Sequence, residues 1–248
     1  MVAIDPTLLT DPTLLTNILL IGLSGTLICL AVHFIPVGGA PAAMAQATGI
    51  GTGTVELAAG SGLVGLITAS YMYAYEPLAS IPLVMAAGAM GSMVMLASTM
   101  FAGSLIYAYG VAVPFASAQV KKDPITGDRQ DTYISKGTQG QGLPTICFVS
   151  GVVGAALGGA GGGLIYFVLM DLYKPLIALT SAFAVAGVFT MGVMYVNSVI
   201  PSYGVGGTIE GVHDPKFRRV VGKDVITSFF VSILCGLLAV LIAGGMSI

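Results

Sequence analysis

Residues 33–60, HFIPVGGAPAAMAQATGIGTGTVELAAG, interrupt an otherwise hydrophobic chain with prolines, glycines and oxygen-bearing side chains. Pro36 and Pro41 break helices, and the glycines between positions 38 and 53 permit backbone conformations that other residues avoid. Irregular backbone is tolerated at membrane depth only where protein buries it or where it lines a watery cavity. The stretch therefore predicts either a broken or re-entrant segment of an ion path or a connection whose glycines only let helices pack closely.

Three side chains near the end of this stretch are candidate sodium ligands. Thr52, Thr54 and Glu56 place two hydroxyls and a carboxylate close together beside glycine carbonyls. Hard cations prefer oxygen ligands of these kinds. The alternative for Glu56 is a solvated residue in the first turn of a helix, where the helix dipole stabilises a negative charge.

The composition of the chain places it in a membrane. Hydrophobic residues make up 56% of the 248 residues, charged residues only 8%, and the mean hydropathy is +0.95. So few charges cannot cover the surface of a soluble domain of this size. The sequence therefore predicts an integral membrane protein that contacts lipids, and we expect no nucleic-acid partner.

Hydropathy along the chain predicts an all-α, polytopic fold. An apolar run needs about 20 residues to cross the bilayer core as a helix. Six runs satisfy this length within a single membrane domain, 1–248, and they cover residues 14–35, 55–75, 78–113, 144–170, 175–200 and 225–246.

Glycines at four-residue spacing mark the fourth predicted span. Gly154, Gly158 and Gly162 lie on one face of a helix, and Gly159 and Gly163 repeat the spacing one position along. Small residues at this spacing let a neighbouring helix approach closely in lipid. We therefore interpret the glycine face as a packing surface.

The distribution of positive charge predicts the orientation in the membrane. Loops 36–54, 114–143 and 201–224 follow the odd-numbered spans and hold eight of the nine Lys and Arg residues. Positively charged loops remain in the cytoplasm. We therefore expect these three loops to be cytoplasmic and both termini to lie outside the cell.

Catalytic chemistry is not expected in this chain. Cys29, Cys147 and Cys235 all fall within apolar spans without paired spacing, which is typical of small buried residues rather than of disulfides or metal ligands. His33, near the inner end of the first span, is either a hydrogen-bonded residue of a helix end or a functional ionisable group. No residue is assigned a catalytic or cofactor-binding role.

Two stretches together resemble one family. The segment HFIPVGGAPAAMAQATGIGTGT, the polar segment KKDPITGDRQDTYISKGTQGQGLP and the six-span layout resemble the D subunits of methyltetrahydromethanopterin:coenzyme M methyltransferase. The resemblance implies a methanogenic archaeon and a complex that couples methyl transfer to sodium export. It further implies membrane partners, the C and E subunits, and a cobamide cofactor on another subunit. It assigns no catalytic residue here, and the acidic residue implicated in sodium coupling belongs to the E subunit.

Two other functions fit the same sequence. An independent secondary transporter or channel would use the broken stretch after the first span as its site, although intramembrane charge is scarce. A purely structural subunit would use its glycine faces to fill one position in a membrane assembly. Co-purification separates these hypotheses, because only a methyltransferase subunit brings corrinoid-containing partners with it.

Overall fold

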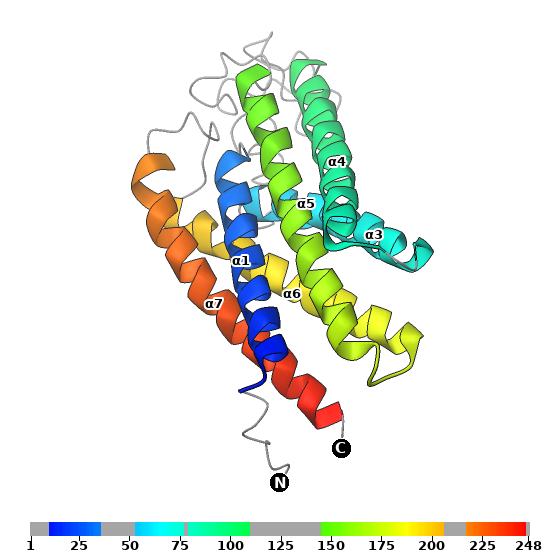
Figure 1. Cartoon of the computed structure of the whole chain (residues 1–248). Coiled ribbons are helices and arrows are strands. Elements are labelled where there is room, and N and C mark those ends of the chain that lie inside the picture. The colour runs from blue at the N-terminus through cyan, green and yellow to red at the C-terminus, as the bar shows by residue number, and fades with distance from the viewer. Residues whose placement is uncertain (1–9, 36–52, 77–78, 110–144, 206–216, 247–248) are drawn as a thin grey trace, which may run out of the picture.

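The computed structural model describes residues 10–35, 53–76, 79–109, 145–205 and 217–246, with side chains at 10–35, 61–76, 79–102, 148–201 and 220–245. Within these ranges the regular structure is entirely helical (Figure 1). The helices are α1 (Pro12–Phe34), α3 (Gly53–Tyr75), α4 (Ile81–Tyr109), α5 (Thr145–Tyr173), α6 (Leu179–Val205) and α7 (Phe217–Met246). The all-α fold expected from the hydropathy is therefore confirmed for the described residues.

The first helix begins as its local sequence predicts. The Asp11 side chain caps α1 by accepting a hydrogen bond from the backbone N–H of Thr13 at 2.7 Å, and Pro12 occupies the first helical position. Proline fits there because its missing N–H would have no partner within the helix. The helix ends at Phe34, two residues before Pro36.

Helix α5 occupies the centre of the bundle. In the 26-residue apolar segment of α5, 61% of the residues are buried, against 28% in the corresponding segments of α4 and α7. It packs against α1, α3, α4 and α6. Its second half carries the largest buried side chains, which include Tyr166, Leu169 and Tyr173. The core of the protein therefore surrounds this helix.

Glycines let the helices beside α5 come within backbone contact. A Cβ on Gly163 would lie 2.9 Å from the carbonyl oxygen of Val84, and one on Gly159 would overlap the carbonyl of Gly88 in α4. Serine and threonine hydroxyls add hydrogen bonds between helices, as from Ser150 to the carbonyl of Phe34 at 2.6 Å. Close approach and hydroxyl donors are the usual means of helix association in lipid.

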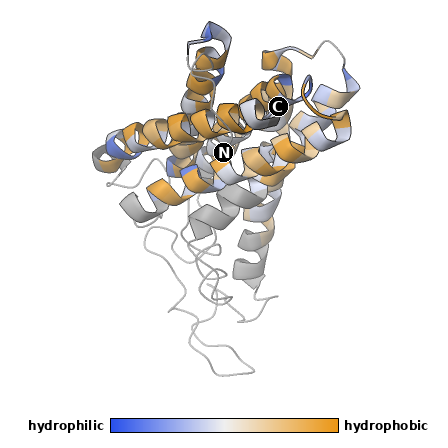
Figure 2. Cartoon of the chain, turned by 90° about the horizontal axis from the view of Figure 1, so that it is seen from below, coloured by the Kyte–Doolittle hydropathy of each residue, from blue (hydrophilic) through white to orange (hydrophobic). Residues whose placement is uncertain are grey.

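The helices suit a membrane in length and composition. Five described segments are long and apolar enough to cross it: Pro12–Phe34, Ile81–Ala102, Phe148–Tyr173, Leu179–Pro201 and Val220–Gly245. Hydrophobic residues, coloured orange, occur along the described helices (Figure 2). These segments indicate a multi-pass membrane protein. The remaining expected span, 55–75, lies within α3, whose side chains are described only from Ser61 onward, so six spans remain a prediction.

Two helices extend beyond the spans expected from hydropathy. Helix α7 begins at Phe217, so residues 217–224 are helical although their charges predict a loop. Helix α6 continues through Pro201 to Val205. A hydropathy window ends where charge or proline appears, whereas a helix continues as long as its backbone hydrogen bonds are satisfied. The broken or re-entrant stretch expected after the first span lies, for residues 36–52, outside the described residues.

The beginning of α1 and the end of α7 lie at the same end of the bundle. Helices α1 and α7 pack side by side and run in opposite directions (Figure 1). Helices α3 and α6 pack together and cross behind α1 and α5. The C-terminal end of α1 therefore lies beside the beginning of α7.

Candidate functional site

A line of polar residues runs along the contact of α1, α6 and α7. We call it the polar seam and define it as Gly25, His33, Asn197, Asp224, Ser228 and Ser232. Asp224, Ser228 and Ser232 recur every four residues and therefore share one face of α7, and all three are buried. On α1, Gly25 and His33 are two such intervals apart and face them. Buried polar groups in an apolar bundle are costly unless they are paired, so this line has a specific role.

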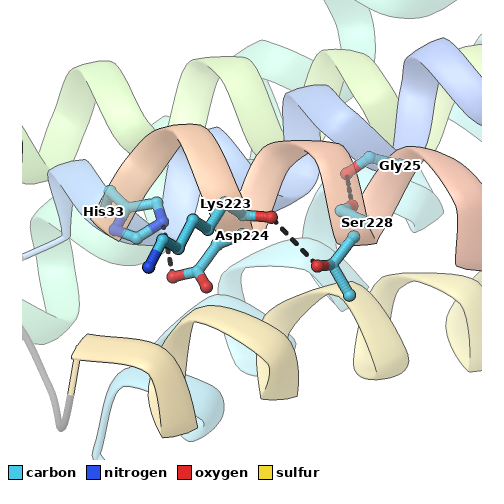
Figure 3. A network of polar contacts seen from close by, with 6 residues as sticks. Gly25, His33, Lys223, Asp224 and Ser228 are labelled. Carbon is cyan, nitrogen blue, oxygen red and sulfur yellow. Dashed lines mark hydrogen bonds and ion pairs between the residues drawn. The ribbon is translucent and has the colours of Figure 1, made fainter. Parts of the chain in front are cut away.

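An ionisable pair forms the end of the seam. His33 Nε2 lies 3.4 Å from Asp224 Oδ2, which joins the C-terminal end of α1 to the N-terminal part of α7 (Figure 3). His33 is 1% exposed and Asp224 is 7% exposed. The pair is therefore shielded from solvent by the surrounding helices. It can take up or release a proton only if water or another polar group reaches this end of the bundle.

Hydroxyl groups continue the seam into the bundle. Ser228 Oγ lies 2.9 Å from the carbonyl oxygen of Gly25 and also within hydrogen-bond distance of Asn197 Oδ1. One hydroxyl proton serves only one of these acceptors at a time. Gly25 leaves the necessary space, because a Cβ at this position would overlap Ser232 Oγ. The carbonyl oxygen of Gly25 in α1 can therefore accept a hydrogen bond from Ser228 of α7.

Asn197 connects the third helix to the seam. Its Nδ2 donates hydrogen bonds to the carbonyl of Val193 and to Ser232 Oγ, both at 2.8 Å. Ser232 Oγ also lies 3.1 Å from Asn197 Oδ1, so the two side chains can exchange donor and acceptor roles. Asn197 is fully buried. The amide therefore sets the register of α6 against α7.

The described part of the chain contains no cluster of side chains of the kind that binds a metal ion. No group of three His, Cys, Asp or Glu side chains converges there. Cys29 and Cys235 are free thiols. What the seam offers is a set of neutral oxygens and one His–Asp pair, an arrangement suited to holding helices in register and to transferring a proton between two partners.

Comparison with known proteins identifies the family. Residues 14–232 match the family model described as the D subunit of tetrahydromethanopterin S-methyltransferase. The D subunit from Methanothermobacter thermautotrophicus is 52% identical over 236 residues, which cover 95% of this chain and 98% of the relative. That from Methanosarcina mazei is 54% identical over 229 residues, or 88% of this chain and 90% of the relative.

The chain belongs to this D-subunit family. A further match, from Methanopyrus kandleri, is 49% identical over 226 residues, or 91% of this chain and 96% of the relative. The resemblance noted from residues 33–54 and 121–144 is thereby confirmed. These relatives match over nearly their whole length, so the described helices represent the common fold of the family.

Two of the three sodium candidates lie at the beginning of α3. Thr52 falls outside the described residues. Thr54 and Glu56 lie in the first turn of α3, which begins at Gly53, and their side chains are also outside the described part. The helical position agrees with both interpretations of Glu56, so the sodium assignment stays a prediction.

Gly154, Gly158 and Gly162 of the fourth span contact two different helices. Cβ atoms on Gly154 and Gly158 would meet α1, at 2.6 Å from the carbonyl oxygen of Ala31 and 3.3 Å from its Cβ, respectively. A Cβ on Gly162 would instead lie 2.8 Å from Met194 Sδ of α6. All three glycines therefore pack against other helices of this chain.

Sequence patterns alone do not reveal most of the polar seam. They identify His33 as ionisable, but they assign Asp224 to a loop and do not distinguish Asn197 from its apolar neighbours. The available signal is the four-residue recurrence of Asp224, Ser228 and Ser232, since polar residues repeating on one face of an apolar helix indicate a buried polar contact.

Proposed function

We propose that this chain is the D subunit within the membrane part of a tetrahydromethanopterin S-methyltransferase complex. The observation that carries the proposal is the family match over residues 14–232, and the apolar helices support a membrane position. In this role the chain is a non-catalytic subunit. Methyl transfer and the cobamide belong to partner subunits, and the C and E subunits are its membrane neighbours.

The same role includes coupling between methyl transfer and sodium export. Transfer of the methyl group releases free energy that a conformational change must carry to the membrane. Two parts of the chain suit such coupling. One is the set of oxygen-bearing side chains Thr52, Thr54 and Glu56, of which the last two belong to the first turn of α3, and the other is the polar seam. The seam links α1, α6 and α7 by specific contacts, so a shift of one helix must rearrange the others.

The proposed orientation places the loops between α1 and α3, α4 and α5, and α6 and α7 in the cytoplasm. The positive charges of these loops support it. The fold is compatible with it, because the end of α1 and the beginning of α7 lie beside each other, at the opposite end of the bundle from the beginning of α1 and the end of α7 (Figure 1). A membrane-impermeant thiol reagent tests it: a cysteine introduced in 121–136 should react only from the cytoplasmic side.

Purification of the tagged chain from mild detergent tests the main proposal. We expect the other methyltransferase subunits, with their corrinoid, to co-purify. Vesicles with the complete complex should accumulate sodium during methyl transfer, and complex lacking this subunit should not. Normal sodium transport by the depleted complex would reject the coupling role.

An independent transporter or channel is the second candidate. The glycine-rich stretch after the first span favours it. This function predicts that the chain purifies alone or as a homo-oligomer and transports its ion in vesicles without methyl donors.

A purely structural scaffold is the remaining alternative, and it predicts a third result. The complex would require the chain for assembly but would retain sodium transport after substitution of Glu56 and of the polar seam.

A further inference from the structure

A polar pocket of about 300 Å³ opens where α3 and α5 end and α6 begins. Its lining combines the carboxylates of Glu76 and Asp171 with the ammonium group of Lys174, and all three residues are exposed. Tyr73 OH donates a hydrogen bond to Asp171 Oδ1 at 3.1 Å, and Lys174 Nζ lies 5.8 Å from the centre of the Tyr73 ring. Two negative charges and one positive charge therefore face one pocket.

An apolar groove of about 430 Å³ lies beside this pocket, between α3 and α6. Leu66 and Ile67 line it from α3, and Phe183 and Gly187 line it from α6. Ile67 is 63% exposed. The groove therefore presents a hydrophobic surface to whatever surrounds the bundle.

The pocket and the groove are neighbours. Ala74 and Phe183 line both of them. The Tyr73 ring packs edge-on against Tyr166 of the groove, with centroids 6.2 Å apart, and against Phe167 of the pocket, with centroids 5.5 Å apart. From Phe183 to Gly187 the groove extends about 6 Å along α6 at about 1.5 Å per residue. A polar pocket and an apolar groove therefore lie next to each other at this end of the bundle.

We propose that this site binds one zwitterionic aminophospholipid. Its hydrocarbon chain lies in the groove, its phosphate contacts Lys174, and its ammonium group contacts the carboxylates of Asp171 and Glu76. The site extends from helix ends into the apolar part of the bundle, which matches the way a lipid lies in its membrane. Aromatic residues at the boundary are typical of the membrane–water interface.

The charges select this headgroup among membrane lipids. A purely anionic headgroup would place its charge beside two carboxylates and only one lysine, and basic pockets are the usual sites for such lipids. A neutral headgroup would leave the charges of the pocket to water and would gain no charged contact from them. A headgroup that carries a phosphate and an ammonium group pairs with the lysine through the first and with the carboxylates through the second.

A photoreactive lipid tests the site in the purified methyltransferase complex. The probe is a phosphoethanolamine lipid with a diazirine in its hydrocarbon chain, and the labelled residues are identified by peptide mass spectrometry. We expect labelling within residues 66–74 and 183–187. Unlabelled phosphoethanolamine lipid should compete about tenfold better than a phosphoglycerol lipid. Equal competition, or labelling spread evenly over all lipid-facing helices, would overturn the proposal.

Two glycines of α6 provide a matched pair of variants. A Cβ at Gly187 or at Gly192 would meet nothing within 4 Å, so both positions accept a larger side chain. Only Gly187 lines the groove. Gly187→Leu should reduce labelling about tenfold, and Gly192→Leu should leave it unchanged. Equal labelling of the two variants would show that the groove does not hold the lipid chain.

Charge variants separate the headgroup contacts from the chain contacts. Asp171→Asn should abolish the preference for phosphoethanolamine over phosphoglycerol, and Lys174→Gln should weaken competition by both lipids. Lys223→Gln removes the same charge near the beginning of α7, outside the pocket lining, and serves as the control. Cross-linking of the groove to another protein of the complex, with no lipid label, would assign the surface to a protein partner and reject the proposal.

Discussion

His33 of α1 and Asp224 of α7 form a buried contact between ionisable side chains, with a distance of 3.4 Å between Nε2 and Oδ2. The two residues are far apart in the sequence, and hydropathy places one in a span and the other in a loop. Their contact joins the end of the first helix to the beginning of the last. The pair therefore links two helices that no local pattern connects.

Removing one member of this pair should cost more than removing both. Asp224→Leu leaves His33 buried without its carboxylate neighbour, and loss of the partner of a buried polar group costs about 1–3 kcal/mol of unfolding free energy. The double variant His33→Leu with Asp224→Leu should recover much of this loss. Titration with a denaturing detergent measures the unfolding free energy of each variant. Strictly additive losses of this free energy would show that the two side chains do not interact.

Asn197 should be the central residue of the seam for stability. Asn197→Leu removes the partner of Ser232 and the α6 link to α7, which should lower the unfolding free energy by about 1–3 kcal/mol. Val196→Leu, at the neighbouring and exposed position, is the control and should be close to wild type. The same detergent titration reports both. Equal stability of the two variants would mean that the seam contributes no net stabilisation.

Gly158 should tolerate alanine but not leucine. Its Cβ would lie 3.3 Å from the Ala31 Cβ, a tight contact that a small shift accommodates, whereas leucine would push α1 away from α5. Size-exclusion chromatography of the complex should therefore show normal assembly for Gly158→Ala and loss of assembly for Gly158→Leu. Gly192→Leu, in open space, is the control for the added volume. A fully assembled Gly158→Leu complex would contradict the observed packing.

Glu56→Gln tests the proposed sodium ligand at the beginning of α3. The amide preserves the shape of the side chain but removes the charge that a hard cation prefers. A ligand role predicts that the sodium concentration for half-maximal methyl transfer rises about tenfold. Thr54→Val tests the neighbouring hydroxyl in the same assay. Unchanged sodium affinity in both variants would place the ion path in a partner subunit and leave Glu56 as a residue of the first helical turn.

Local features of the chain are predictable because their physical causes are local. Asp11 and Pro12 cap and begin a helix by contacts within one turn, and the family match rests on a linear order of residues. Helix ends are less predictable where charge or proline occurs. Residues 217–224 are helical despite their charges, and Asp224 at the end of this stretch lies 3.4 Å from His33.

The sequence by itself determined that this protein is a helical membrane protein of the D-subunit family. Hydropathy is sufficient for the helical membrane fold, since each helix satisfies its own backbone hydrogen bonds inside a membrane. Only the tertiary structure decided which faces meet, and therefore that Gly154 contacts α1 while Gly162 contacts α6. It alone paired His33 with Asp224 and placed a charged pocket beside an apolar groove. Helices that are apolar on every side carry no pattern that distinguishes a neighbour from lipid, so close packing between specific small and polar residues makes that choice.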